Sequence, residues 1–172
     1  EILNAVRELS KYMSGATLAH MKAMLRVMHY CHETPNRGLL LKPTRKWNGD
    51  PNFKFIISGY SDSDYAKDTD TRRNVSGTAV FVEGSPVCVR SGGQKSVTLS
   101  VTEAEQAAAV TCSQDMLFTM RLMESMGLKV QLPMILRLDN KGAHDLAHNW
   151  TIGGRTRHVD VRMNFLRELK EQ

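Results

Sequence analysis

The sequence predicts an α/β fold in which helices flank a mixed β-sheet. Apolar residues keep a helical period at the start of the chain and change to the alternation typical of strands after a polar run at 43–52. A long segment at 102–126 then returns to the helical period. At 172 residues, with 41% hydrophobic and 24% charged side chains, the chain is long enough for one domain with a real core and a small appendage.

The first part of the chain is predicted to be helical. Residues 2–13 and 17–32 carry apolar side chains at spacings of three and four, and residues 39–41 form a short apolar run that predicts a strand. The run at 43–52 is rich in proline, glycine and asparagine, which break regular structure. We therefore predict a helical segment at 1–50 and a main domain at 51–172.

The main domain alternates between strands and helices. Short links between its first three strands predict an antiparallel meander. Gly127 is placed to end the long helix. The expected elements are strands at 53–62, 76–82, 86–89 and 134–138, and helices at 102–126, 139–148 and 159–169.

Charge and cysteine content restrict the environment. The net charge is +5, and residues 1–50 carry 8 Lys and Arg against 4 Asp and Glu. A basic leading segment suits a polyanion such as nucleic acid, although on charge alone a solvated helix face is the favoured explanation. Three scattered cysteines without a CxxC pair favour a reducing compartment. No apolar run reaches the ~20 residues of a membrane helix, so no membrane partner is expected.

Three carboxylates lie where predicted elements begin or end. Asp62 follows the first main strand, Glu105 lies in the first turn of the long helix, and Asp139 ends the fourth strand. If the fourth strand pairs with the first, Asp62 and Asp139 emerge side by side, and a helix packed across the sheet brings Glu105 to them. A divalent cation would relieve their mutual repulsion, and hard oxygen ligands suit Mg²⁺ or Mn²⁺. Two such ions about 4 Å apart support phosphodiester cleavage.

Each carboxylate also has a simpler local interpretation. Asp62 stands in a turn-like Ser-Asp-Ser-Asp, where aspartate often bonds its own backbone. Glu105 completes a capping box with Thr102, and Asp139 matches the N-cap of the helix that follows it. Considered singly, all three are better explained by these local roles than by a metal site.

Five motifs in order change that balance. They read Gly-Tyr-Ser-Asp-Ser-Asp-Tyr-Ala at 59–66, Asp-Thr-Arg-Arg-Asn-Val-Ser-Gly at 70–77, Leu-Ser-Val-Thr-Glu-Ala-Glu at 99–105, Asp-Asn-Lys-Gly-Ala at 139–143 and Arg-Thr-Arg-His-Val-Asp-Val-Arg at 155–162. Together they resemble the ribonuclease H domain of copia-type LTR retrotransposon Pol polyproteins. Residues 1–42 resemble the end of the reverse transcriptase and the link that precedes this domain.

The resemblance implies a ribonuclease H-like mixed sheet and a specific chemistry. Strands 1–3 would be antiparallel, and strand 4 parallel to strand 1. The family implies a divalent-metal endonuclease that cuts the RNA strand of an RNA–DNA hybrid. Asp62, Glu105 and Asp139 match its first three catalytic carboxylates and would bind Mg²⁺ or Mn²⁺. We choose Glu105 over Glu103, which matches a capping box with Ser100, because Glu105 precedes Gln-Ala-Ala as the family's catalytic glutamate does.

The chain also departs from the family pattern. The family continues into a fifth strand and a helix that carries a fourth carboxylate, and this chain ends at Gln172 before both. By alignment Asp160 precedes the fifth strand, so we do not assign it the missing role. Gln106 replaces a usual aromatic residue. We expect a C-terminally incomplete domain whose open sheet edge needs a partner and whose isolated activity is little or none.

Three functions follow from these expectations. The leading one is a metal-dependent endonuclease acting on RNA–DNA hybrids during retrotransposon reverse transcription. The alternative is a catalytically impaired remnant that acts as a structural or nucleic-acid-binding subunit. A same-fold, integrase-like nuclease is disfavoured by the motifs around the carboxylates. The expected partners are the hybrid and the rest of the polyprotein, or another protein that covers the open edge. The expected location is intracellular, in a cytoplasmic virus-like particle or the nucleus.

One further metal motif is discounted. His144 and His148 stand four residues apart on a predicted helix, which matches zinc-ligand spacing. No nearby glutamate or third histidine completes a site. We expect these histidines to be mostly surface residues.

Overall fold

The computed structural model describes residues 2–64, 74–94, 98, 100–138, 165–166 and 168–169. Contacts divide the chain into two compact units, Glu1–Leu40 and Leu41–Gln172. The domain boundary at residue 50 stays a prediction. The helix predicted at 139–148 lies outside the described residues, and the described positions of the predicted helix 159–169 are helical.

The first unit contains the two predicted helices. Helix α1 spans Leu3–Ser10 and helix α2 spans Leu18–Glu33. A capping box between Thr17 and His20 starts α2. The strand predicted at 39–41 is wrong, because these leucines are exposed and no described strand pairs with them. In the described part of the chain, no helix has the length and apolar character needed to cross a membrane.

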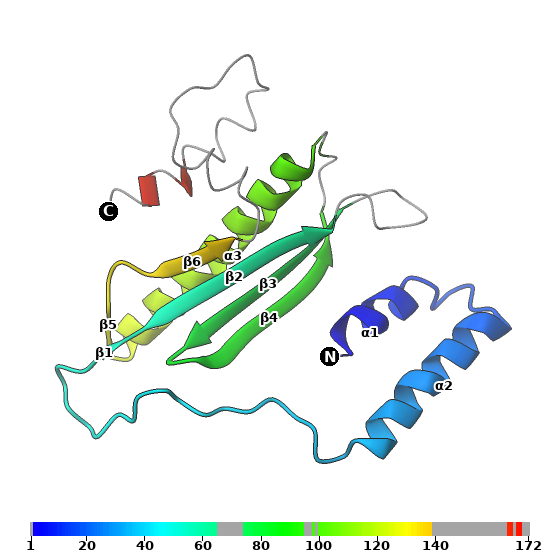
Figure 1. Ribbon diagram of the computed structural model, residues 1–172, viewed down its shortest axis with the longest axis horizontal. Coiled ribbons are helices and arrows are strands. Elements are labelled where there is room, and N and C mark those ends of the chain that lie inside the picture. Colours follow the sequence, from blue (N-terminus) through cyan, green and yellow to red (C-terminus); the bar gives the residue numbers. More distant parts are fainter. Residues whose placement is uncertain are drawn as a thin grey trace. The chain divides into compact units, whose positions relative to one another are not determined.

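The second unit is built on a four-stranded mixed sheet with the strand order β4-β3-β2-β6 (Figure 1). Strands β2, β3 and β4 form the predicted antiparallel meander, and β6 runs parallel to β2. The sequence prediction of fold class is therefore confirmed: the chain is mixed α/β and consistent with a ribonuclease H-like fold. The strands are β1 (Lys54–Phe55), β2 (Ile57–Asp64), β3 (Val75–Val82), β4 (Ser85–Gly93), β5 (Lys129–Val130) and β6 (Ile135–Leu138).

The first predicted strand is divided at Ile56. The backbone N–H of Ile56 donates to Glu83 Oε1, and the N–H of Glu83 donates to the carbonyl of Ile56. Upstream of Ile56, β1 leaves the main sheet and pairs in parallel with β5, a strand that the sequence did not predict. Glu83 and Gly84 both have positive φ (49° and 76°), as a two-residue turn between β3 and β4 requires.

Arg45 fastens the polar run at 43–52 to that turn. Its guanidinium forms an ion pair with the buried Glu83 carboxylate, with 2.5 Å between Arg45 Nη2 and Glu83 Oε1. This hydrogen bond from Arg45 holds the pKa of Glu83 below its usual value. The backbone N–H of Thr44 also donates to the carbonyl of Glu83. The polar run is therefore packed against the sheet rather than being a free linker.

Helix α3 (Val101–Ser125) lies across one face of the sheet (Figure 1). Its bounds differ by one residue from the predicted 102–126. Ser100 caps its start by accepting the N–H of Glu103. At the end of α3, Gly127 has φ +78°. The N–H groups of Gly127 and Leu128 donate to the carbonyls of Glu124 and Met123 in the last turn, as predicted for a glycine that ends a helix.

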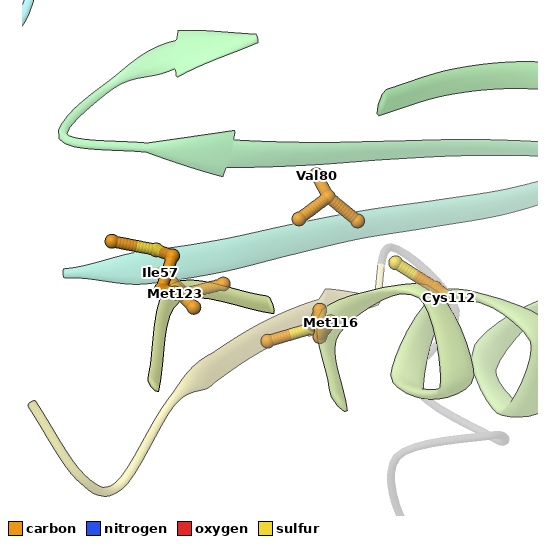
Figure 2. Packing of buried hydrophobic residues seen from close by; sticks show 5 residues of the cluster. All are labelled: Ile57, Val80, Cys112, Met116 and Met123. Atoms are coloured by element: carbon orange, nitrogen blue, oxygen red, sulfur yellow. The ribbon is translucent and has the colours of Figure 1, made fainter. Parts of the chain in front are cut away.

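The core lies between α3 and the sheet (Figure 2). Ile57 of β2 and Val80 of β3 are fully buried against Cys112, Met116 and Met123 of α3. Methionine adapts to an irregular gap, so this face of α3 can follow the twisted sheet. We call this side of the sheet the helix face and the opposite side the open face.

Gly59 permits the closest approach of α3 to β2. A Cβ atom at position 59 would lie 2.5 Å from Met116 Sδ and 2.8 Å from Cys112 Sγ. Cys112 Sγ also donates to the carbonyl of Tyr60 at 3.4 Å. A side chain at 59 would therefore force Cys112 and Met116 to shift.

We predict that Gly59→Ala lowers the free energy of unfolding by about 1–3 kcal/mol, because the added methyl group overpacks this contact. Gly92→Ala is the matched control, since a Cβ atom there meets nothing within 4 Å. Urea denaturation of both variants measures the difference. Equal stability of the two variants would show that the packing of α3 on β2 does not require glycine at position 59.

Candidate functional site

Asp62 lies inside β2 and not in a turn. Because β2 continues to Asp64, the turn interpretation of the Ser-Asp-Ser-Asp motif is wrong. Along this strand Ser61 and Ser63 are buried on the helix face, while Tyr60 and Asp62 are exposed. Since side chains alternate along a strand, the Asp62 carboxylate lies on the open face.

Glu105 is buried beside the same strand. The helix starts at Val101 with Ser100 as its cap, so a capping box between Thr102 and Glu105 is ruled out. Glu105 therefore begins the second turn, where its side chain is 3% exposed. Its Oε1 accepts the backbone N–H of Ser63 at 3.2 Å, one residue beyond Asp62.

The third predicted carboxylate, Asp139, lies outside the described residues. Its neighbour Leu138 is the last residue of β6 and pairs with Ser61 of β2. The described pairing of β6 with β2 thus ends one residue before Asp62. Beyond that point the backbone N–H of Ser63 in β2 donates to the Glu105 carboxylate instead of to a neighbouring strand.

The types of ligand present fit a hard divalent cation, because carboxylate oxygens are what Mg²⁺ prefers. Asp62 and Glu105 approach β2 from different sides: one side chain lies on the open face, and the other contacts Ser63 from α3. Within the described ranges, no group of three or more His, Cys, Asp or Glu side chains could hold a metal ion. His144, His148 and Asp160 also lie outside those ranges.

The interior beside Asp62 is unusually polar. The buried groups that have no hydrogen-bond partner among the described residues include Ser61 Oγ, Ser63 Oγ, Thr78 Oγ1 and Gln106 Nε2. Each such group retains a desolvation cost that an apolar residue would avoid. Polar groups of this kind collect at functional segments that are not optimised for stability. The sequence signal was Gln106, which stands where an aromatic residue is usual.

The open face of the sheet contains a hollow that the sequence did not reveal. The hollow has a volume of about 570 Å³, and the residues that line it include Tyr60, Asp62, Ala79, Val89 and Arg137. Asp62 thus faces a concave surface that is accessible from solvent.

Cys112 is a core residue and not part of this hollow. Burial raises the pKa of the Cys112 thiol to about 11, which keeps the thiol protonated.

Comparison with known proteins identifies relatives of the chain. It is 32% identical over 167 residues, 97% of its length, to the retrovirus-related Pol polyprotein from transposon RE1 of Arabidopsis thaliana. It is 31% identical over 169 residues to the corresponding polyprotein from transposon TNT 1-94 of Nicotiana tabacum. A third relative, the secreted RxLR effector protein 161 of Plasmopara viticola, is 34% identical over 67% of this chain and 75% of the effector.

The chain belongs to a sequence family that includes a segment of copia-type retrotransposon Pol polyproteins. It spans 11–12% of the length of these polyproteins. No protein-family model matches it.

Two Glu105 variants separate its structural role from its charge in this Pol-related chain. Glu105→Ala leaves the N–H of Ser63 without its acceptor, so we expect a loss of about 1–3 kcal/mol in unfolding free energy. Glu105→Gln keeps an amide oxygen at the same reach, so stability should stay close to that of the parent. Hydrogen exchange of the Ser63 amide by NMR should be accelerated only in the alanine variant. Unchanged protection in that variant would contradict the contact.

Proposed function

We propose that the chain is a divalent-metal-dependent endonuclease domain that hydrolyses the RNA strand of RNA–DNA hybrids during retrotransposon reverse transcription. The observation that carries the proposal is the end of the β2–β6 pairing. There the strand with Asp62, the helix with Glu105 and the residue before Asp139 lie together. The Pol polyprotein relatives support the same context.

Asp62, Glu105 and Asp139 would hold Mg²⁺ or Mn²⁺ in this proposal. When bound, such ions supply an activated water and stabilise the leaving oxygen of a phosphodiester. The chain's own contribution is positional. Burial of Glu105 and its bond to the Ser63 backbone restrict the motion of that carboxylate relative to β2.

The proposed partners are the hybrid and other parts of the polyprotein. Helix α2 presents a row of exposed apolar side chains that would suit a protein neighbour: Leu18, Met21, Leu25 and Met28. In the main sheet β6 is an outer strand among those described, so another segment or protein could pair with it. The proposed location is intracellular, in a cytoplasmic virus-like particle or the nucleus.

One observation favours the alternative of a catalytically impaired remnant. Glu105 already accepts a backbone N–H, and Asp62 lies on the other side of the strand. Glu105 could therefore persist for a structural reason in a subunit that only binds nucleic acid or supports a larger assembly.

Cleavage of labelled RNA within an RNA–DNA hybrid tests the two candidates. Cleavage of the RNA strand should require Mn²⁺ or Mg²⁺ and should be little or none for residues 1–172 alone, so the rate is also measured in a longer Pol segment that contains them. In that longer form Asp139→Asn should reduce the rate at least about 100-fold, because a metal ligand is lost. Removal of the metal with EDTA should abolish cleavage.

Duplex DNA of the same sequence is the substrate control, because selection of the hybrid requires reading of the 2′-OH of one strand. Equal cleavage of hybrid and duplex DNA would favour an integrase-like nuclease instead. Absence of metal-dependent cleavage in both the short chain and the longer segment would favour the remnant.

A further inference from the structure

Arg137 is held at a defined position on the open face. In the parallel register of β2 and β6 it stands directly beside Tyr60. Its guanidinium lies over the Tyr60 ring, 5.2 Å from the ring centre, and Nη1 donates to the Tyr60 hydroxyl. Stacking on an aromatic ring restricts a long side chain that would otherwise be mobile.

This guanidinium differs from two others in the same unit. Arg45 forms an ion pair with Glu83, and Arg90 forms one with Asp115 at 3.0 Å. Among the described residues, no carboxylate forms an ion pair with Arg137. Its bond to a neutral hydroxyl leaves most of its five donors and its full charge available to a ligand.

Arg137 and Asp62 line the same hollow. Tyr60 and Asp62 are two residues apart on β2, which places their backbones about 7 Å from one another on one face. A ligand in the hollow can therefore reach the guanidinium and the proposed metal-binding carboxylate at once. The planar fork of arginine matches the geometry of phosphate oxygens.

We propose that Arg137, seated on Tyr60, binds a backbone phosphate of the nucleic acid and positions that strand relative to Asp62. This assignment rests on the proposed function and adds the residue that orients its substrate. Arg137 acts as a positioning residue. The Tyr60 ring is its platform, and the phosphate replaces water at its free donors.

Binding, measured without cleavage, tests the assignment. Fluorescence anisotropy with an RNA–DNA hybrid in Ca²⁺ gives the affinity of the full 172-residue chain as a function of salt. Arg137→Gln should weaken binding about tenfold. It should also reduce the slope of log affinity against log salt by about one, as loss of one phosphate contact requires.

Arg121→Gln is the matched control. Arg121 is an exposed arginine on α3, and its substitution removes the same charge as Arg137→Gln. It should leave both affinity and slope nearly unchanged. Arg137→Lys separates charge from shape: it should keep the slope and still lose affinity, because a lysine lacks the fork. Thermal melts of all variants check that each is folded.

Three results would overturn the assignment: unchanged salt dependence in Arg137→Gln, an equal effect of Arg121→Gln, or no binding of the hybrid by the parent chain. Each is independent of the cleavage experiment. If the parent chain cuts hybrids while Arg137→Gln shows unchanged affinity and salt dependence, the proposed nuclease function stands and only this assignment is overturned.

Discussion

The close packing of α3 on β2 is the constraint on which the rest of the site depends. Because Gly59 has no side chain, Cys112 and Met116 rest directly on the strand. Glu105 lies seven residues before Cys112, two helical turns or about 10 Å away, and Ser63 lies four residues, or about 13 Å, beyond Gly59. The two lengths differ by only about 3 Å, and α3 runs antiparallel to β2 (Figure 1). The contact at Gly59 thus aligns Glu105 with Ser63.

Features with local causes could be predicted from the sequence. The bounds of α3 follow from a serine at its start and a glycine at its end, so the predicted range is wrong by a single residue. The meander and the parallel fourth strand follow from apolar alternation, short links and the family resemblance. The division of the first strand at Ile56 could not be predicted, because its cause is a carboxylate 27 residues away.

The candidate site shows the same limit. Local patterns offered a turn for Asp62 and a capping box for Glu105, and both are wrong because the observed strand and helix bounds place these residues elsewhere. The partner of Glu105 is a backbone N–H 42 positions away, which no local pattern contains. Likewise, only the pairing of β6 with β2 places Arg137 beside Tyr60. Asp139 lies outside the described residues, and its role stays a prediction.

The central proposal is that Glu105 shares a metal ion with Asp62 and Asp139, although the Asp62 and Glu105 side chains approach β2 from different sides. Anomalous scattering from crystals soaked in Mn²⁺ tests it most directly, because the signal locates the ion without assumptions about activity. The account predicts a peak within coordination distance of the Asp62 and Glu105 carboxylates, lost in Asp62→Asn. A peak at His144 and His148, with none near Glu105, would contradict it.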